Sequence, residues 1–127
     1  MLKRLIAASF LTLSLTLFAA AADDANSANK TLDGYLVDVA CASGPHKTAD
    51  WAAKHSKGCL NMDECKESGY AVVTAGDKVY KFDAKGNEEA RKLIDSTDKK
   101  NNMKISVDGA VNDQAQTVAV NKIEFQK

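Results

Sequence analysis

The residues with the most reactive side chains, three cysteines and two histidines, all lie in one part of this 127-residue chain. Cys41, Cys59 and Cys65, together with His46 and His55, fall within a stretch of 25 residues, and the chain has no other cysteine or histidine. Thiolate sulfur and imidazole nitrogen bind zinc and soft ions such as Cu(I). The stretch therefore predicts a metal site formed by Cys41, Cys59, Cys65 and His55, with zinc or copper as the ion.

The choice of the fourth ligand depends on the helix expected just before Cys59, because that helix leads directly to this cysteine. His55 lies on that helix and is the preferred ligand, while His46 and Asp38 are its substitutes. The cysteines are spaced 18 and 6 residues apart, so they lack the Cys-x-x-Cys pair that is most typical of structural zinc sites. The spacing alone does not distinguish a metal site from other uses of the same thiols.

A disulfide bond is the alternative use of these cysteines. Cys41 follows the first expected strand and Cys65 is expected to face the core, so Cys41–Cys65 is the preferred pair and Cys41–Cys59 is the next. Closing a loop of this size stabilises a fold by roughly 3 kcal/mol in the chain-entropy model. The third thiol is then left over, either buried or available to join two chains in a disulfide-linked dimer.

Enzyme activity is not expected from the motifs of this chain. Cys59, beside Lys57 and just before a helix, is the candidate for a redox-active thiol, but it has no Cys-x-x-Cys partner. The chain also has no haem attachment motif, glycine-rich phosphate loop or Gly-x-Ser-x-Gly elbow. We expect a binding or structural module rather than an enzyme.

The first residues predict export from the cytoplasm. Lys3 and Arg4 precede an apolar run over residues 5–18, and four alanines at 19–22 precede Asp23. This order is typical of a secretory signal peptide, and the run is too short and too rich in Ser and Thr for a membrane anchor. We predict a signal peptide over 1–22 with cleavage near Ala22, a flexible leader over 23–29, a single domain over 30–127, and a periplasmic or secreted location without a transmembrane segment.

The charge balance argues against nucleic acid as a partner. Without the signal peptide the chain keeps 15 basic and 17 acidic side chains, a net charge of −2. Nucleic-acid binding needs a clear excess of Lys and Arg on one face. The expected partner is therefore an unidentified ligand of the cell envelope or the extracellular space.

Apolar alternation and turn residues predict five strands and three helices. The strands are expected at 31–40, 70–74, 78–82, from Met103 past Gly109, and at 117–125, and the helices at 48–56, 61–68 and 87–96. This order predicts a mainly β (α+β) domain: a small five-stranded OB-like barrel with a helix between strands 3 and 4, and a cysteine-rich, partly helical insertion between strands 1 and 2. An open antiparallel sheet of the same elements is the alternative.

Two glycines and one change of parity indicate where the strands bend. Gly34 and Gly109 interrupt the first and fourth strands, where a small barrel must curve. In the last strand the apolar positions change parity between Val120 and Ile123, which predicts a bulge near Asn121.

With these elements placed, the chain resembles a group of small exported bacterial proteins of uncharacterised function. Their pattern opens with Gly-x-x-x-Asp-x-x-Cys and continues with two more cysteines and a glycine, here Gly34, Asp38, Cys41, Cys59, Cys65 and Gly69. It ends in Val-x-Gly-x-Val, here 107–111, and a final strand, here 118–125. The resemblance covers most of the mature chain and implies a small OB-like barrel with no established activity.

Together, these observations predict an exported β-barrel binding module that binds a metal ion through a Cys/His cluster. The alternative is a disulfide-stapled structural or protein-binding module of the cell envelope with no metal. The two differ in free thiols, since the metal module has three after the ion is removed and the stapled module has one, or none in a dimer.

Overall fold

The computed structural model describes residues 27–45 and 48–127. The predicted signal peptide, its cleavage point and His46 lie outside the described residues. The first strand begins at Ser27, so residues 27–29, which we assigned to a flexible leader, belong to the sheet. They pair with Asn112, Val111 and Ala110 of β4 (Lys104–Asn112). Backbone pairing therefore holds them in the sheet, although their small, polar side chains do not indicate a strand.

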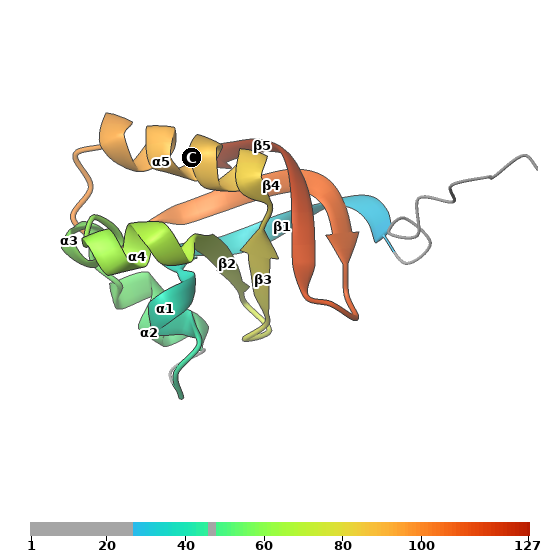
Figure 1. Ribbon diagram of the computed structural model, residues 1–127, viewed down its shortest axis with the longest axis horizontal. Helices are drawn as coiled ribbons and strands as arrows, with labels where there is room; N and C mark the ends of the chain where they lie inside the picture. Colours follow the sequence, from blue (N-terminus) through green and yellow to red (C-terminus); the bar gives the residue numbers. More distant parts are fainter. Residues whose placement is uncertain (1–26, 46–47) are drawn as a thin grey trace, which may run out of the picture.

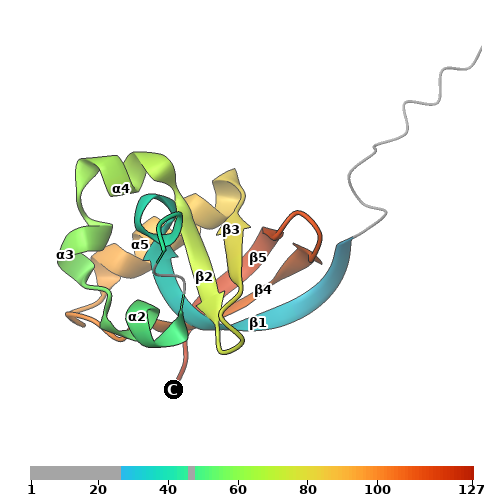
Figure 2. The same cartoon turned by 90° about the horizontal axis from the view of Figure 1, so that it is seen from below.

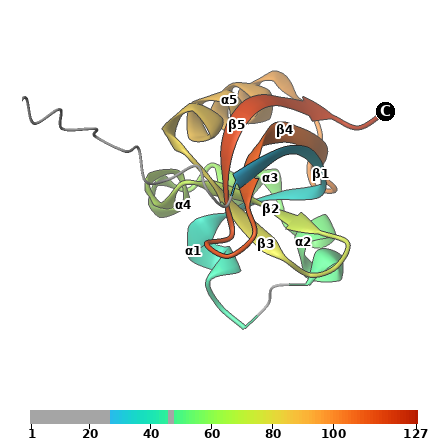
Figure 3. The ribbon, with the colours of Figure 1, turned by 90° about the vertical axis from the view of Figure 1, so that its right-hand side faces the viewer.

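Five strands close into a barrel in the order β1-β2-β3-β5-β4, as Figures 1 and 3 show. Every neighbouring pair is antiparallel except β3 and β5, which run parallel. The OB-like barrel is therefore confirmed, and the closed sheet excludes the open-sheet alternative. The strands are β1 (Ser27–Asp38), β2 (Tyr70–Thr74), β3 (Val79–Phe82), β4 (Lys104–Asn112) and β5 (Thr117–Phe125).

The barrel interior is filled by the inward positions of the strands and by one helix. Leu36, Val72 and Ile105 are fully buried there, and α5 (Ala84–Ser96), between β3 and β4, adds Ile94. Helix α5 begins three residues before the predicted start at Asn87, because the Asp83 side chain accepts a hydrogen bond from the Gly86 amide. The Asn87 side chain instead accepts a hydrogen bond from the amide of Tyr70 at the start of β2.

The predicted bulge is confirmed, and the two strand glycines lie where neighbouring strands pack closely. A Cβ atom at Gly34 would overlap the Val73 carbonyl oxygen, and one at Gly109 would overlap that of Ala119, so neighbouring strands approach closely at both positions. The register of β4 and β5 shifts between Asp108 and Gly109, which makes Asn121 the extra residue of a bulge.

Four short helices form the insertion between β1 and β2, and Figure 2 shows them gathered on the side of these strands away from β4 and β5. Helices α1 and α3 were not predicted, because each has four residues and too little sequence to show a helical period. They begin at side-chain caps, Asp38 for α1 and Ser56 for α3. The helices are α1 (Val39–Ala42), α2 (Ala49–Lys54), α3 (Lys57–Leu60) and α4 (Asp63–Ser68).

The start of the second predicted helix, at Asn61, is wrong, but the inward position of Cys65 is confirmed. Helix α4 begins after Met62, whose side chain makes no capping hydrogen bond, because Asn61 is instead the residue that ends α3. Leu60 and Cys65 are both buried.

The insertion covers the outer face of β1 and β2. Val37, Ala71 and Val73 point outward from the barrel and form a second, smaller core with Ala42 and Ala52 of the insertion helices. Figure 3 shows α1 and α2 on the opposite side of these strands from α5. Because both faces are covered, β2 is an almost continuous buried run rather than an alternating one.

Among the described residues, no helix has the length and apolar character needed to cross a membrane.

Candidate functional site: a buried carboxylate with two thiols

Asp38, the last residue of β1, is the centre of the candidate site. Its side chain is fully buried, with 0% relative exposure. One carboxylate oxygen, Oδ1, lies 2.6 Å from Nε2 of His55, and the other, Oδ2, accepts a hydrogen bond of 2.9 Å from the amide of Cys41. A buried carboxylate is stable only with such partners, so these contacts explain how Asp38 is accommodated.

Asp38 connects four elements of the chain. It ends β1, its side chain caps α1, and His55 is the residue that ends α2. Cys65 of α4 donates a hydrogen bond from its thiol to the same carboxylate. One acidic side chain therefore joins three insertion helices to the barrel.

Asp38, Cys41 and Cys65 bring three metal-binding atoms together. A carboxylate oxygen and the two Sγ atoms all lie within 4.8 Å of one another. In the part of the chain that the structure describes, this is the only group of three or more such residues. Asp38 and Cys65 are buried, and Cys41 is partly exposed, which leaves one side of the group accessible from solvent.

The electrostatics of the group favour a negative carboxylate and neutral thiols. Burial raises the pKa of Asp38, but hydrogen bonds from His55, the Cys41 amide and the Cys65 thiol outweigh it and bring the pKa down to about 2. Burial, with hydrogen bonding and repulsion from the Asp38 charge, raises the pKa of Cys65 to about 12. Burial and Asp38 also raise the pKa of Cys41. Both thiols are therefore protonated at neutral pH and are poor nucleophiles.

His55 contacts the group through Asp38 and holds that carboxylate in place. Because an ionised carboxylate has no proton to donate, Nε2 of His55 carries the proton of their hydrogen bond. The ring is buried and packs against Trp51, with ring centroids 4.8 Å apart, so its orientation is held on a second side. Trp51 and His55 share one face, as their spacing of four residues predicts.

The structure assembles part of the predicted ligand set. Cys41 and Cys65 meet, whereas Cys59 on α3 is not a member of the group of three donors. His55 reaches the group only through Asp38. The third donor is Asp38, which the sequence offered only as a substitute ligand. Its spacing of three residues before Cys41 is that of a helix cap, and this signal could have given it first rank.

The predicted disulfide is not formed in this structure. All three cysteines are free thiols, and none is at the bonding distance of about 2 Å from another. Cys41 and Cys65, the pair that we preferred, are nevertheless the two that the fold brings within 4.8 Å. Their thiols are hydrogen-bonded to Asp38 and to each other.

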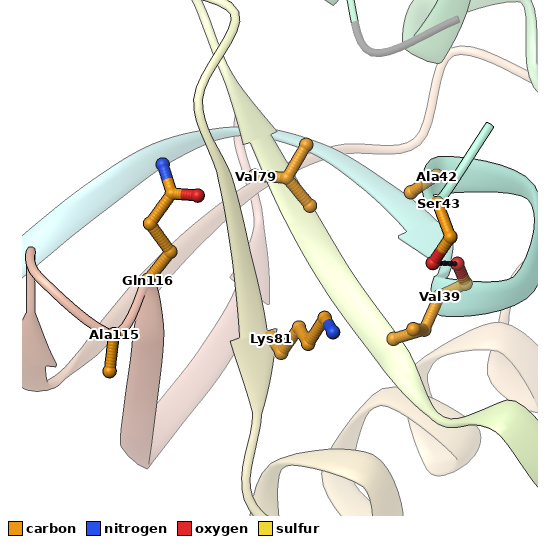
Figure 4. Close-up of a pocket in the computed structure, with 7 residues that line it drawn as sticks. All are labelled: Val39, Ala42, Ser43, Val79, Lys81, Ala115 and Gln116. Atoms are coloured by element: carbon orange, nitrogen blue, oxygen red, sulfur yellow. Dashed lines mark hydrogen bonds between the residues drawn. The ribbon is translucent and has the colours of Figure 1, made fainter. Parts of the chain in front are cut away.

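A groove lies between β3, the turn between β4 and β5, and α1, which carries Cys41. Figure 4 shows the amine of Lys81 between β3 and α1, and the Ser43 hydroxyl donating to the carbonyl oxygen of Val39. The groove has a volume of about 210 Å³, and no Asp, Glu, His or Cys lines it, so it has no metal-ligand set of its own. Its lining residues are Val39, Ala42, Ser43, Val79, Lys81, Ala115 and Gln116.

Comparison of the chain with protein-family models, with curated proteins and with solved structures gave no match.

Proposed function

We propose that this protein is a small β-barrel module that binds one zinc or Cu(I) ion through Cys41, Cys65 and Asp38. The observation that carries the proposal is the mutual distance of 4.8 Å or less among these three donor atoms. Two thiolates and one carboxylate are a donor set suited to zinc, and the thiolates also suit Cu(I).

The distances support the proposal. Zinc binds sulfur at about 2.3 Å and carboxylate oxygen at about 2.0–2.2 Å, so ligands of a tetrahedral site lie about 3.5–4 Å apart. Donors already within 4.8 Å of one another need to approach by only about 1 Å, which side-chain rotation supplies.

The charges support it as well. Asp38 places a buried negative charge beside two thiols, which is unfavourable for thiolates unless a cation lies between them. A bound divalent ion removes this repulsion and gains the full attraction of a site shielded from water. His55 then acts as a partner of Asp38 that orients the carboxylate toward the ion.

The four-ligand set expected from the sequence requires two further changes. His55 must give up its hydrogen bond with Asp38 to bind the ion through Nε2, and Cys59 must move toward Cys41 and Cys65. The three-donor site needs neither change, and its remaining position is then filled by water or a partner molecule.

Zinc titration of three single variants tests the proposal. Native mass spectrometry and calorimetry should give one ion per chain, with binding lost in Cys41→Ser and Cys65→Ser. Cys59→Ser, the matched control from the same insertion, should bind as the unaltered protein does. Equal losses in all three variants would favour the four-ligand set, and no loss in any of them would contradict both sites.

A disulfide-stapled structural or protein-binding module without metal is the second candidate. The closeness of Cys41 and Cys65 supports it too, and the predicted export to the periplasm or exterior would expose the pair to oxidation. Protein purified without reductant distinguishes the two, since the metal module shows three free thiols after chelation. The stapled module shows one thiol and a mass lower by two hydrogens.

A further inference from the structure

We propose that Cys41 and Cys65 form a reversible disulfide that closes the metal site, so that oxidation and metal loading exclude each other. This inference rests on the metal site proposed above, because it concerns the same two sulfur atoms. It makes the two candidate functions alternative states of one site.

The backbones of α1 and α4 are already joined beside this pair. The amide of Ala40 donates to the Ser68 hydroxyl at 3.0 Å, and that hydroxyl donates to the carbonyl oxygen of Cys65 at 2.7 Å. The amide of Val39 also donates to the carbonyl oxygen of Gly69 at 2.9 Å. With the start of α1 held against the end of α4, rotation of the two cysteine side chains is the main movement that the bond needs.

The exposures of the two thiols determine the order of the reaction. Cys41 is partly exposed and Cys65 is buried, with 5% relative exposure. The small fraction of Cys41 that is deprotonated attacks a small external disulfide, such as oxidised glutathione, forms a mixed disulfide and releases one thiol. The Cys65 thiolate then attacks the Cys41 sulfur and releases the second thiol. Two protein thiols are oxidised, one external disulfide is reduced, and the two protons pass to the released thiolates.

The bond would remove two of the three metal-binding groups. Sulfur in a disulfide is no longer a thiolate ligand, and Asp38 alone is a weak site for a soft ion. A bound ion in turn holds both sulfurs and protects them from the external disulfide. Cys59 is outside the group of donors and remains a free thiol in both states.

The test is equilibration of metal-free protein with mixtures of oxidised and reduced glutathione, followed by digestion and peptide mapping. The unaltered protein and Cys59→Ser should lose two hydrogen masses and give a Cys41–Cys65 cross-linked peptide. The oxidised protein should lose zinc binding and regain it after reduction. Zinc added before glutathione should prevent the bond.

The outcomes distinguish the reversible Cys41–Cys65 disulfide, which we call the gate, from the metal site. A cross-link through Cys59 or a lasting glutathione adduct on Cys41 would overturn the gate and leave the metal site standing. Zinc binding unchanged by the Cys41–Cys65 bond would overturn both, because the two sulfurs could not then be the ligands. Reduced protein that binds no zinc or Cu(I) would overturn the metal site and the gate together. A Cys41–Cys65 bond that forms equally with and without bound zinc would overturn the gate alone.

Discussion

Asp38 and His55 form a buried pair, 2.6 Å apart between Oδ1 and Nε2, that joins the end of β1 to the end of α2. The two residues are 17 positions apart in the chain, and both side chains are at most 5% exposed. The pair holds the helical insertion against the barrel and fixes the carboxylate beside Cys41 and Cys65. The contribution of this pair to stability can be measured.

Acid should destabilise the protein through Asp38. Its pKa is about 2 in the folded protein and 3.8 in its ordinary state, so the folded form binds this proton less readily than the unfolded form. The resulting stability, about 2 kcal/mol, is present above pH 4 and is lost as the pH falls through 2. Urea unfolding between pH 2 and 6 measures it, and Asp38→Asn should flatten this part of the pH profile. An unchanged profile in the variant would contradict the assignment.

Removing His55 should cost more than its size suggests. His55→Ala leaves the buried Asp38 charge without its main hydrogen-bond donor, and we expect a loss of about 3 kcal/mol in the free energy of unfolding. His55→Gln is the matched control, because the Gln side-chain amide can donate in place of Nε2 and should restore part of the loss. Equal unfolding midpoints for the two variants in urea would show that the hydrogen bond has no special role.

Metal binding should release protons and strengthen as the pH rises. Both thiols have raised pKa values, that of Cys65 to about 12, so each is protonated before the ion binds. Coordination by two thiolates should release about two protons per ion, and the apparent affinity should increase about 100-fold per pH unit near neutrality. Zinc competition titrations between pH 6 and 8 measure this slope. A slope near zero would mean that Cys41 and Cys65 are not the ligands.

The barrel should tolerate no side chain at Gly34. A Cβ atom there would overlap the Val73 carbonyl oxygen on the neighbouring strand, so Gly34→Ala should lower the free energy of unfolding by roughly 2 kcal/mol or more. Gly76→Ala, in the turn between β2 and β3, is the control because the nearest atom to its added Cβ is 3.9 Å away. Thermal unfolding of the two variants should separate them clearly, and similar midpoints would contradict the close approach of β1 and β2.

Local patterns in the sequence were enough to predict the barrel. The signals are local: strand alternation, the glycines at 34 and 109, and the parity change near Asn121. The alternation of apolar residues within each strand indicates which of its faces is buried. The strand order of the barrel follows the chain from β1 to β3 and then places β5 beside β3, and the fold class agrees with the one predicted from the chain alone. The same patterns placed Cys65 inward, because a buried position within a helix is also a local property.

The meeting of the reactive residues, in contrast, depends on tertiary packing. The sequence alone does not show which of Cys41, Cys59 and Cys65 lie close together. Their contacts depend on the directions of four short helices, two of which are a single turn held by a capping side chain. Those directions are set by packing on the outer face of β1 and β2 and by the hydrogen bonds of Asp38, which act between residues far apart in the chain. For this reason the sequence indicated the insertion that carries the cysteines, while only the tertiary structure brings Cys41 and Cys65 together with Asp38 at the end of β1.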